Sequence, residues 1–175
     1  MSAGLVILLL ASPLAASAQA NSLGAPGCGP ANVQFDVKTD SAQHPFPAPQ
    51  SGKALVLFLQ DDARFQSVPR PTTRFGIDGA WAGATHTNSY FYVSIDPGEH
   101  HLCASWQSRV LVVGPSRPTA AVHFTAEAGN TYCFVARDHL KSEHPPAEVV
   151  LEPLDTDEAQ LLVRSFAFSS SHPKK

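Results

Sequence analysis

Histidine and cysteine are the residues of this chain with the widest chemistry, as metal ligands, acid–base groups and nucleophiles. The 175-residue chain has eight histidines and three cysteines. His100 and His101 are adjacent, so in a strand their side chains point to opposite faces and cannot bind one ion together. His101 and His123 converge only if their strands pair, with His86 on a nearby loop. The sequence contains no His-x-His, His-Glu-x-x-His or Cys-x-x-Cys motif, so we interpret the histidines as surface residues and expect no metal site and no cofactor.

Three cysteines allow one disulfide and leave one thiol free, in three alternative pairings. Cys28 lies in a flexible Gly-Cys-Gly-Pro segment, Cys103 shares a strand face with His101, and Cys133 lies between two aromatic residues. We expect Cys28 to pair with Cys103, which ties the N-terminal arm to the folded body and leaves Cys133 as a buried thiol. A Cys103–Cys133 bond across adjacent strands is the competing pairing. Cys–His nucleophilic catalysis is a third interpretation.

Aromatic side chains form the candidate binding surface. Tyr90 and Tyr92 lie on the strand face opposite Phe91, and Trp81 lies in a Gly-Ala-Trp-Ala-Gly segment beyond a turn. Together the three make a platform for a sugar, a peptide or another protein. In the alternative, the two tyrosines lie under a C-terminal helix as core. The sequence leaves both open.

The remaining charged groups have structural interpretations. Arg64, Arg70 and Arg74 flank a Pro-rich segment that we interpret as a solvated loop, with an anion site as the alternative. Asp61 and Asp62 suit a turn. The chain contains no Gly-x-Ser-x-Gly, no Walker loop and no dinucleotide-binding fingerprint, so it presents none of the common catalytic motifs.

The elements that must position these groups are strands. Alternating polarity and short apolar runs, bounded by Gly, Pro, Asp and Asn turns, are typical of an antiparallel β-sandwich. The predicted strands are residues 33–38, 54–59, 74–78, 89–95, 100–106, 120–126, 131–137 and 147–152. The run at 54–59 is apolar without interruption, which suits a strand covered on both faces.

A single helix is predicted at the C-terminal end. Asp155 and Glu158 resemble a capping box, and an apolar stripe follows, so we expect a helix at 156–166 over the 54–59 strand. The chain then divides into consecutive segments. They are a signal peptide (1–20), a Pro/Gly-rich arm with one strand (21–51), a β-sandwich (52–153), a helical segment (154–168) and a solvated tail (169–175).

The first 20 residues resemble an export signal. An apolar run at 5–10 leads to Ala-Gln-Ala at 18–20, which predicts cleavage before Asn21, although no Lys or Arg precedes the run. The run is too short to span a bilayer, so we do not expect a membrane anchor. Ala-Pro-Gly before Cys28 does not resemble a lipobox, so we expect no lipid anchor. The predicted location is the periplasm or the exterior.

Composition excludes two classes of protein. With 15 acidic and 12 basic residues the net charge is −3, which excludes a nucleic-acid binder that works through a strong basic field. Hydrophobic residues make up 43% of the chain and charged residues 15%, which excludes wholesale disorder.

Several of these segments resemble the exported bacterial family called Domain of Unknown Function 2846. The segments are residues 52–56, 76–79, 88–91, 97–100 and 124–132. The resemblance implies a β-sandwich like transthyretin or the regulatory domain of carboxypeptidases, and it implies no activity and no catalytic residue.

We therefore expect an exported, non-enzymatic β-sandwich that binds a protein or glycan partner, or serves a structural role, in the cell envelope. The alternative is a periplasmic metal- or Cys-dependent enzyme that uses His101, His123 and Cys103.

Overall fold

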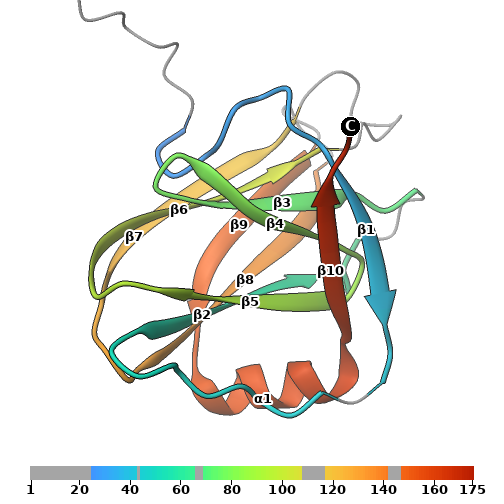
Figure 1. Ribbon diagram of the computed structural model, residues 1–175. Helices are drawn as coiled ribbons and strands as arrows, with labels where there is room; N and C mark the ends of the chain where they lie inside the picture. The colour runs from blue at the N-terminus through green and yellow to red at the C-terminus, as the bar shows by residue number, and fades with distance from the viewer. Residues whose placement is uncertain (1–24, 43, 66–68, 108–116, 142–146) are drawn as a thin grey trace, which may run out of the picture.

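The computed structural model describes residues 25–42, 44–65, 69–107, 117–141 and 147–175, which form two β-sheets and one α-helix (Figure 1). The six-stranded sheet has the order β1-β10-β5-β2-β8-β9 and the four-stranded sheet the order β4-β3-β6-β7. The elements are β1 (Phe35–Asp40), β2 (Ala54–Asp61), β3 (Thr72–Ile77), β4 (Ala80–His86), β5 (Ser89–Ile95), β6 (Gly98–Trp106), β7 (Thr119–Ala126), β8 (Thr131–Leu140), β9 (Ala147–Leu154), α1 (Thr156–Ser165) and β10 (Ala167–Pro173). The prediction of a mainly β sandwich with a single C-terminal helix is confirmed.

The six-stranded sheet is mixed, so the expectation of purely antiparallel pairing is wrong. β2 runs parallel to β8, and β10 runs parallel to β5, whereas the other neighbours in both sheets are antiparallel. Parallel neighbours need a crossover, which passes through the four-stranded sheet for β2 and β8 and through α1 for β10. The turn signals revealed the hairpins but not these long-range pairings.

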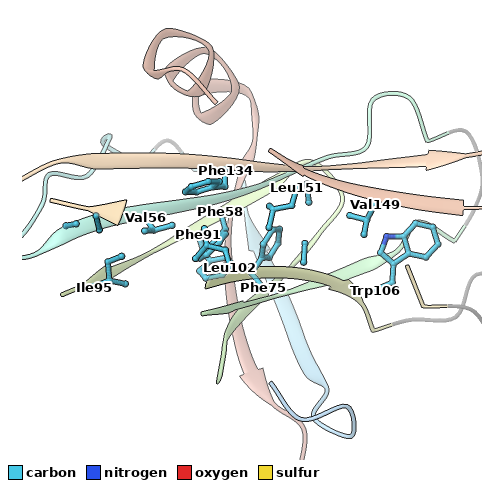
Figure 2. Close-up of a cluster of buried hydrophobic side chains, with 14 of the residues drawn as sticks. Val56, Phe58, Phe75, Phe91, Ile95, Leu102, Trp106, Phe134, Val149 and Leu151 are labelled. Carbon is cyan, nitrogen blue, oxygen red and sulfur yellow. The ribbon is translucent and has the colours of Figure 1, made fainter. Parts of the chain in front are cut away.

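The main core lies between the two sheets (Figure 2). Phe58 is fully buried at its centre, and its ring centroid lies 4.9 Å from that of Phe75 and 5.4 Å from that of Phe91. These three rings come from both sheets, so the core joins the two layers through apolar contact.

A second apolar cluster lies on the other face of the six-stranded sheet, beneath α1. Leu55, Leu57 and Leu59 of β2 pack there against Ala159 and Val163 of the helix. Asp155 caps the helix by accepting a hydrogen bond from the Glu158 amide at 2.9 Å. The predicted helix over β2 is therefore confirmed, and it explains why the β2 run is apolar without alternation.

The predicted solvated tail is wrong, because residues 167–173 form β10. This strand pairs with β1 along its length and with β5 at its start. Two of its serines bond to the neighbouring strand β4. Ser171 Oγ accepts from the Ala84 amide at 3.0 Å, and Ser169 Oγ donates to the Ala84 carbonyl at 3.3 Å. The hydroxyls thus satisfy the free edge of β4, which a polar tail sequence does not reveal.

The segment around Trp81 is strand β4, which was not among the predicted strands. Its small residues make room for the core. A Cβ atom on Gly83 would lie 2.9 Å from ring carbons of Phe91, so only glycine fits there. β4 pairs with β3 through the Asp78–Gly79 turn, and a bulge follows Phe75.

Candidate functional site

The outer face of the four-stranded sheet carries the N-terminal arm, defined here as residues 25–34, which crosses β3 and β6 (Figure 1). A disulfide joins Cys28 of the arm to Cys103 of β6, with the Cα atoms 5.1 Å apart. This is the pairing favoured from the sequence. Because Cys103 is fully buried and bonded, it offers no thiolate to the Cys–His catalysis considered above.

The arm lies in direct backbone contact with the sheet. A Cβ atom on Gly76 would lie 2.4 Å from the Gly27 carbonyl oxygen, and one on Gly27 would lie 2.5 Å from the His101 carbonyl oxygen. Gly27 also has a positive φ of 83°, which favours glycine. The close approach therefore depends on these two glycines.

Arg74 of β3 binds the arm through hydrogen bonds to its backbone. Its guanidinium donates hydrogen bonds to the carbonyls of Ala31 and Val33 and lies 4.2 Å from the centre of the Trp81 ring. No carboxylate among the described residues pairs with it, and its Nε atom has no partner there. Burial, with repulsion from Arg117, lowers the pKa of Arg74 to about 10. Arg74 is thus a buried cation balanced by carbonyls and an aromatic ring, and it lies in a strand, as the predicted strand at 74–78 implied.

Trp81, Tyr90 and Tyr92 do not form a common platform. Trp81 packs on Arg74 and donates to the Pro30 carbonyl at 2.8 Å, on the four-stranded sheet. Tyr90 is buried in the cluster beneath α1. Tyr92 stays 41% exposed on the same sheet as Tyr90. The core interpretation holds for Tyr90, and the three-residue platform is wrong because its members lie on different sheets.

His101 and His123 do come together. They are directly opposite in the β6–β7 ladder, with ring centroids 6.2 Å apart, and both are exposed. His86 lies at the far end of β4, where its ring is 3.2 Å from the Thr72 hydroxyl, so it does not join them. Within the described residues, no group of three or more His, Cys, Asp or Glu side chains could hold a metal ion.

His100, on the other face of β6, is a structural ion-pair partner. Its Nδ1 lies 2.6 Å from Asp78 Oδ2 and its Nε2 lies 2.8 Å from the Asp96 carbonyl. Both partners are acceptors, so both ring nitrogens donate and the ring carries a charge. Burial lowers the pKa of His100, but these two bonds outweigh burial and raise it.

A carboxyl pair is buried where β2 and β8 meet the four-stranded sheet. Asp62 and Asp138 are 0% and 1% exposed and hydrogen-bond to each other. Gln60 donates to Asp62 Oδ1 at 3.0 Å and to Asp138 Oδ2 at 2.9 Å, and Trp106 Nε1 donates to Asp138 Oδ1 at 2.7 Å. Thr85 completes the group by donating to Gln60 Oε1 at 2.7 Å. Four strands and both sheets are thereby joined by one polar network.

The two carboxyls share a proton. Burial, together with the neighbouring Asp62 carboxyl, raises the pKa of Asp138 well above its ordinary value. Burial also raises the pKa of Asp62. A neutral Asp138 can donate to Asp62 while accepting from Trp106 and Gln60. Asp62 also begins a turn, as predicted, because its carbonyl accepts from the Phe65 amide at 2.9 Å. Only the polarity of Gln60 at the end of an apolar run hinted at the buried network.

Arg137 forms ion pairs with three partly exposed carboxylates of the same region. Its guanidinium pairs with Asp61 at 3.4 Å, with Glu152, and with Glu158 at 2.8 Å, along a cleft of about 580 Å³. Glu158, predicted to cap α1, therefore also fixes the helix to β8. Arg64 lies in the wall of this cleft and Arg74 on the outer face of the other sheet, so these two arginines do not assemble the anion site that was the alternative to a solvated loop.

Comparisons of the chain with protein-family models, with curated proteins and with solved structures found no match. The resemblance to Domain of Unknown Function 2846 therefore stays a prediction. Within the described residues, no helix has the length and apolar character needed to cross a bilayer.

The reactive groups of this molecule are mostly committed to the fold. The remaining thiol, Cys133, is buried, and burial raises its pKa to about 11. Among the described residues, His101 and His123 are exposed, and their side chains project from the four-stranded sheet beside the arm.

Proposed function

We propose that this protein is an exported β-sandwich module that acts in the cell envelope by binding or structural support, without catalysis. The observation that carries the proposal is the disulfide between Cys28 and Cys103, which attaches the N-terminal arm to the outer face of a sheet. Such a bond persists in oxidising compartments and is rare where glutathione and thioredoxin keep thiols reduced. The signal-like segment at 1–20, outside the described residues, supports the same location.

The absence of catalysis is proposed from the way the ionisable groups are used. Asp62 and Asp138 are shielded from solvent and bonded to neighbouring side chains. Arg137 has three carboxylate partners. Cys133 keeps its proton at neutral pH, and a thiol is a poor nucleophile compared with a thiolate. Each group therefore has a structural role that accounts for its environment.

Membership of Domain of Unknown Function 2846 belongs to the same proposal, since the two-sheet architecture is the one that this resemblance implies. The partner that we propose is a protein or glycan of the envelope.

Fractionation of the native cells tests the location. We expect the chain in the periplasmic or secreted fraction, beginning at Asn21, with a Cys28–Cys103 peptide pair in a non-reducing digest. Cys133 should react with a thiol reagent only after unfolding. Recovery in the cytoplasm with Cys28 and Cys103 reduced would overturn the proposal.

Site-specific photo-crosslinking in intact cells tests the binding role. A crosslinker at Tyr92 or Leu161, which are 41% and 66% exposed, should capture a defined envelope component. The matched control is a crosslinker at Thr125, which is exposed on β7 of the four-stranded sheet. Equal, unselective labelling from all three positions would contradict a specific partner on the helix-covered side.

A further inference from the structure

The pair His101 and His123 brings two imidazole rings together on an exposed face of the four-stranded sheet. The two residues are cross-strand neighbours, their ring centroids are 6.2 Å apart, and both side chains are exposed. Two imidazoles on one ion have metal–nitrogen bonds of about 2.0–2.1 Å, so their ligand nitrogens lie about 3 Å apart. Rotation of the two exposed side chains can bring the nitrogens to that spacing without moving either strand.

Asp78 fixes the backbone of His101 through two hydrogen bonds. Its amide donates to Asp78 Oδ1 at 2.8 Å, and its carbonyl accepts from the Asp78 amide at 2.9 Å. Two residues further along β6, Cys103 is tied to the arm by the disulfide. A ligand held on a rigid strand loses little freedom when it binds an ion, so this half of the pair is preorganised.

The pair lies in a shallow hollow that is open to solvent. Pro26 of the arm, with Ala121 and Val122 of β7, lines this hollow of about 240 Å³ together with the two histidines.

We propose that His101 and His123 bind one divalent transition-metal ion through their imidazole nitrogens, with water completing the coordination. Two protein ligands impose little geometry on the ion, so the preference between metals should follow their intrinsic affinity for nitrogen ligands. In that order Cu²⁺ binds more tightly than Ni²⁺ and Zn²⁺. A two-nitrogen, two-oxygen set also suits the tetragonal geometry of Cu²⁺. Protons compete for the same nitrogens, so binding weakens on acidification. Such a site does not depend on the cellular location proposed above.

Titration of the purified full chain with Cu²⁺, in the presence of glycine as competitor, tests the proposal. The variants are His101→Ala and His123→Ala, and the matched control is His172→Ala, which removes an exposed strand histidine that faces Asp36. Loss of an outer partner already costs about 10–100-fold in affinity, so each ligand variant should lose about tenfold or more. The control should bind as the unchanged protein does.

Electron paramagnetic resonance of the 1:1 complex supplies a second measurement. We expect hyperfine splitting from two imidazole nitrogens, reduced to one in either ligand variant. Nuclear magnetic resonance of the unchanged protein supplies a third measurement. Substoichiometric Cu²⁺ should broaden the ring resonances of His101 and His123 before those of other histidines. Unchanged affinity in both ligand variants, or first broadening at another histidine or at the N-terminal amine, would overturn the proposal.

Discussion

The two sheets are covered on their outer faces by different means. On the six-stranded sheet, helix α1 covers Leu55, Leu57 and Leu59 with apolar side chains of its own. On the four-stranded sheet, the arm has no regular secondary structure beyond turns and is held by a disulfide, by Arg74 and by contacts of glycine backbone. One cover depends on the hydrophobic effect, whereas the other depends on oxidation and on one buried cation.

This difference has a consequence for stability. Burial of apolar area holds α1 under reducing and oxidising conditions alike. The arm has few apolar contacts to replace its covalent bond, so its attachment should respond to the redox state. The two covers can therefore be removed separately.

Removal of the disulfide should have the largest effect. Cys28→Ala with Cys103→Ala opens a loop with a sequence separation of 75 residues and should lower the free energy of unfolding by about 3–4 kcal/mol, measured by urea denaturation. Cys133→Ala, which removes the free thiol, should cost about 1 kcal/mol. Hydrogen exchange should accelerate in residues 25–34 and stay unchanged in α1. Equal acceleration in both covers would refute their independence.

A cavity beneath the helix should have the next largest effect. Leu57 is fully buried against α1, so Leu57→Ala should cost about 3 kcal/mol. Leu161 on the same helix is 66% exposed, and Leu161→Ala should stay within about 0.5 kcal/mol of the unchanged protein. Thermal unfolding under reducing and oxidising conditions should give the same difference between the two variants. A difference that depends on the redox state would couple the helix to the disulfide.

Arg74→Met should loosen the arm with a smaller cost. The carbonyls of Ala31 and Val33 lose their donor, and Trp81 loses its cation. Water can replace part of the lost hydrogen bonding, so we expect the free energy of unfolding, measured by urea denaturation, to fall by about 1–2 kcal/mol. Arg64→Met, at an exposed arginine, is the control and should change little. A stabilised Arg74→Met protein would mean that burial of the cation costs more than its contacts return.

The Asp62–Asp138 pair lies where the two sheets meet. Its titration should change the stability of the fold without detaching α1 or the arm. The unfolded chain releases this proton near the ordinary pKa of Asp, whereas folded Asp138 keeps it up to its raised pKa, so between these two pKa values the unfolded state binds fewer protons. Stability therefore falls with rising pH, by at most about 1.4 kcal/mol per pH unit for one proton.

Asp138→Asn removes this titration and should flatten the profile, as measured by the difference in unfolding free energy between variant and unchanged protein across pH. Asp157→Asn, at an exposed carboxylate of α1, is the control and should leave the profile unchanged. An unaltered slope in Asp138→Asn would show that the pair does not share a proton.

Sequence patterns predicted the helix-covered side well and the arm-covered side poorly. The uninterrupted apolar run of β2 predicted a strand covered twice, and Asp155 with Glu158 predicted the start of α1. Local sequence patterns do not indicate which segment, far away in the sequence, will pack its backbone against the face of a sheet. The contact of Gly27 with Gly76 and the carbonyl partners of Arg74 therefore had no readable signal, although the cysteines indicated that some attachment exists.

The candidate site follows the same division. The sequence predicted that His101 and His123 converge if their strands pair, and β6 does pair with β7. Asp62 and Asp138 are 76 residues apart, as 138 − 62 = 76, and meet only because β2 and β8 are parallel neighbours. The polar stretch after α1 gave no hint that Ser169 and Ser171 bond to the edge of β4.

The pairing of β1 with β10 sets the order in which the molecule can fold. β1, near the start of the described chain, has its strand partner in residues 167–173. A chain that emerges from its N-terminus therefore cannot complete the six-stranded sheet until its last strand has been synthesised. Such distant pairings slow folding. The pairing of β1 therefore waits for residues 167–173, even where the strands between them have already formed.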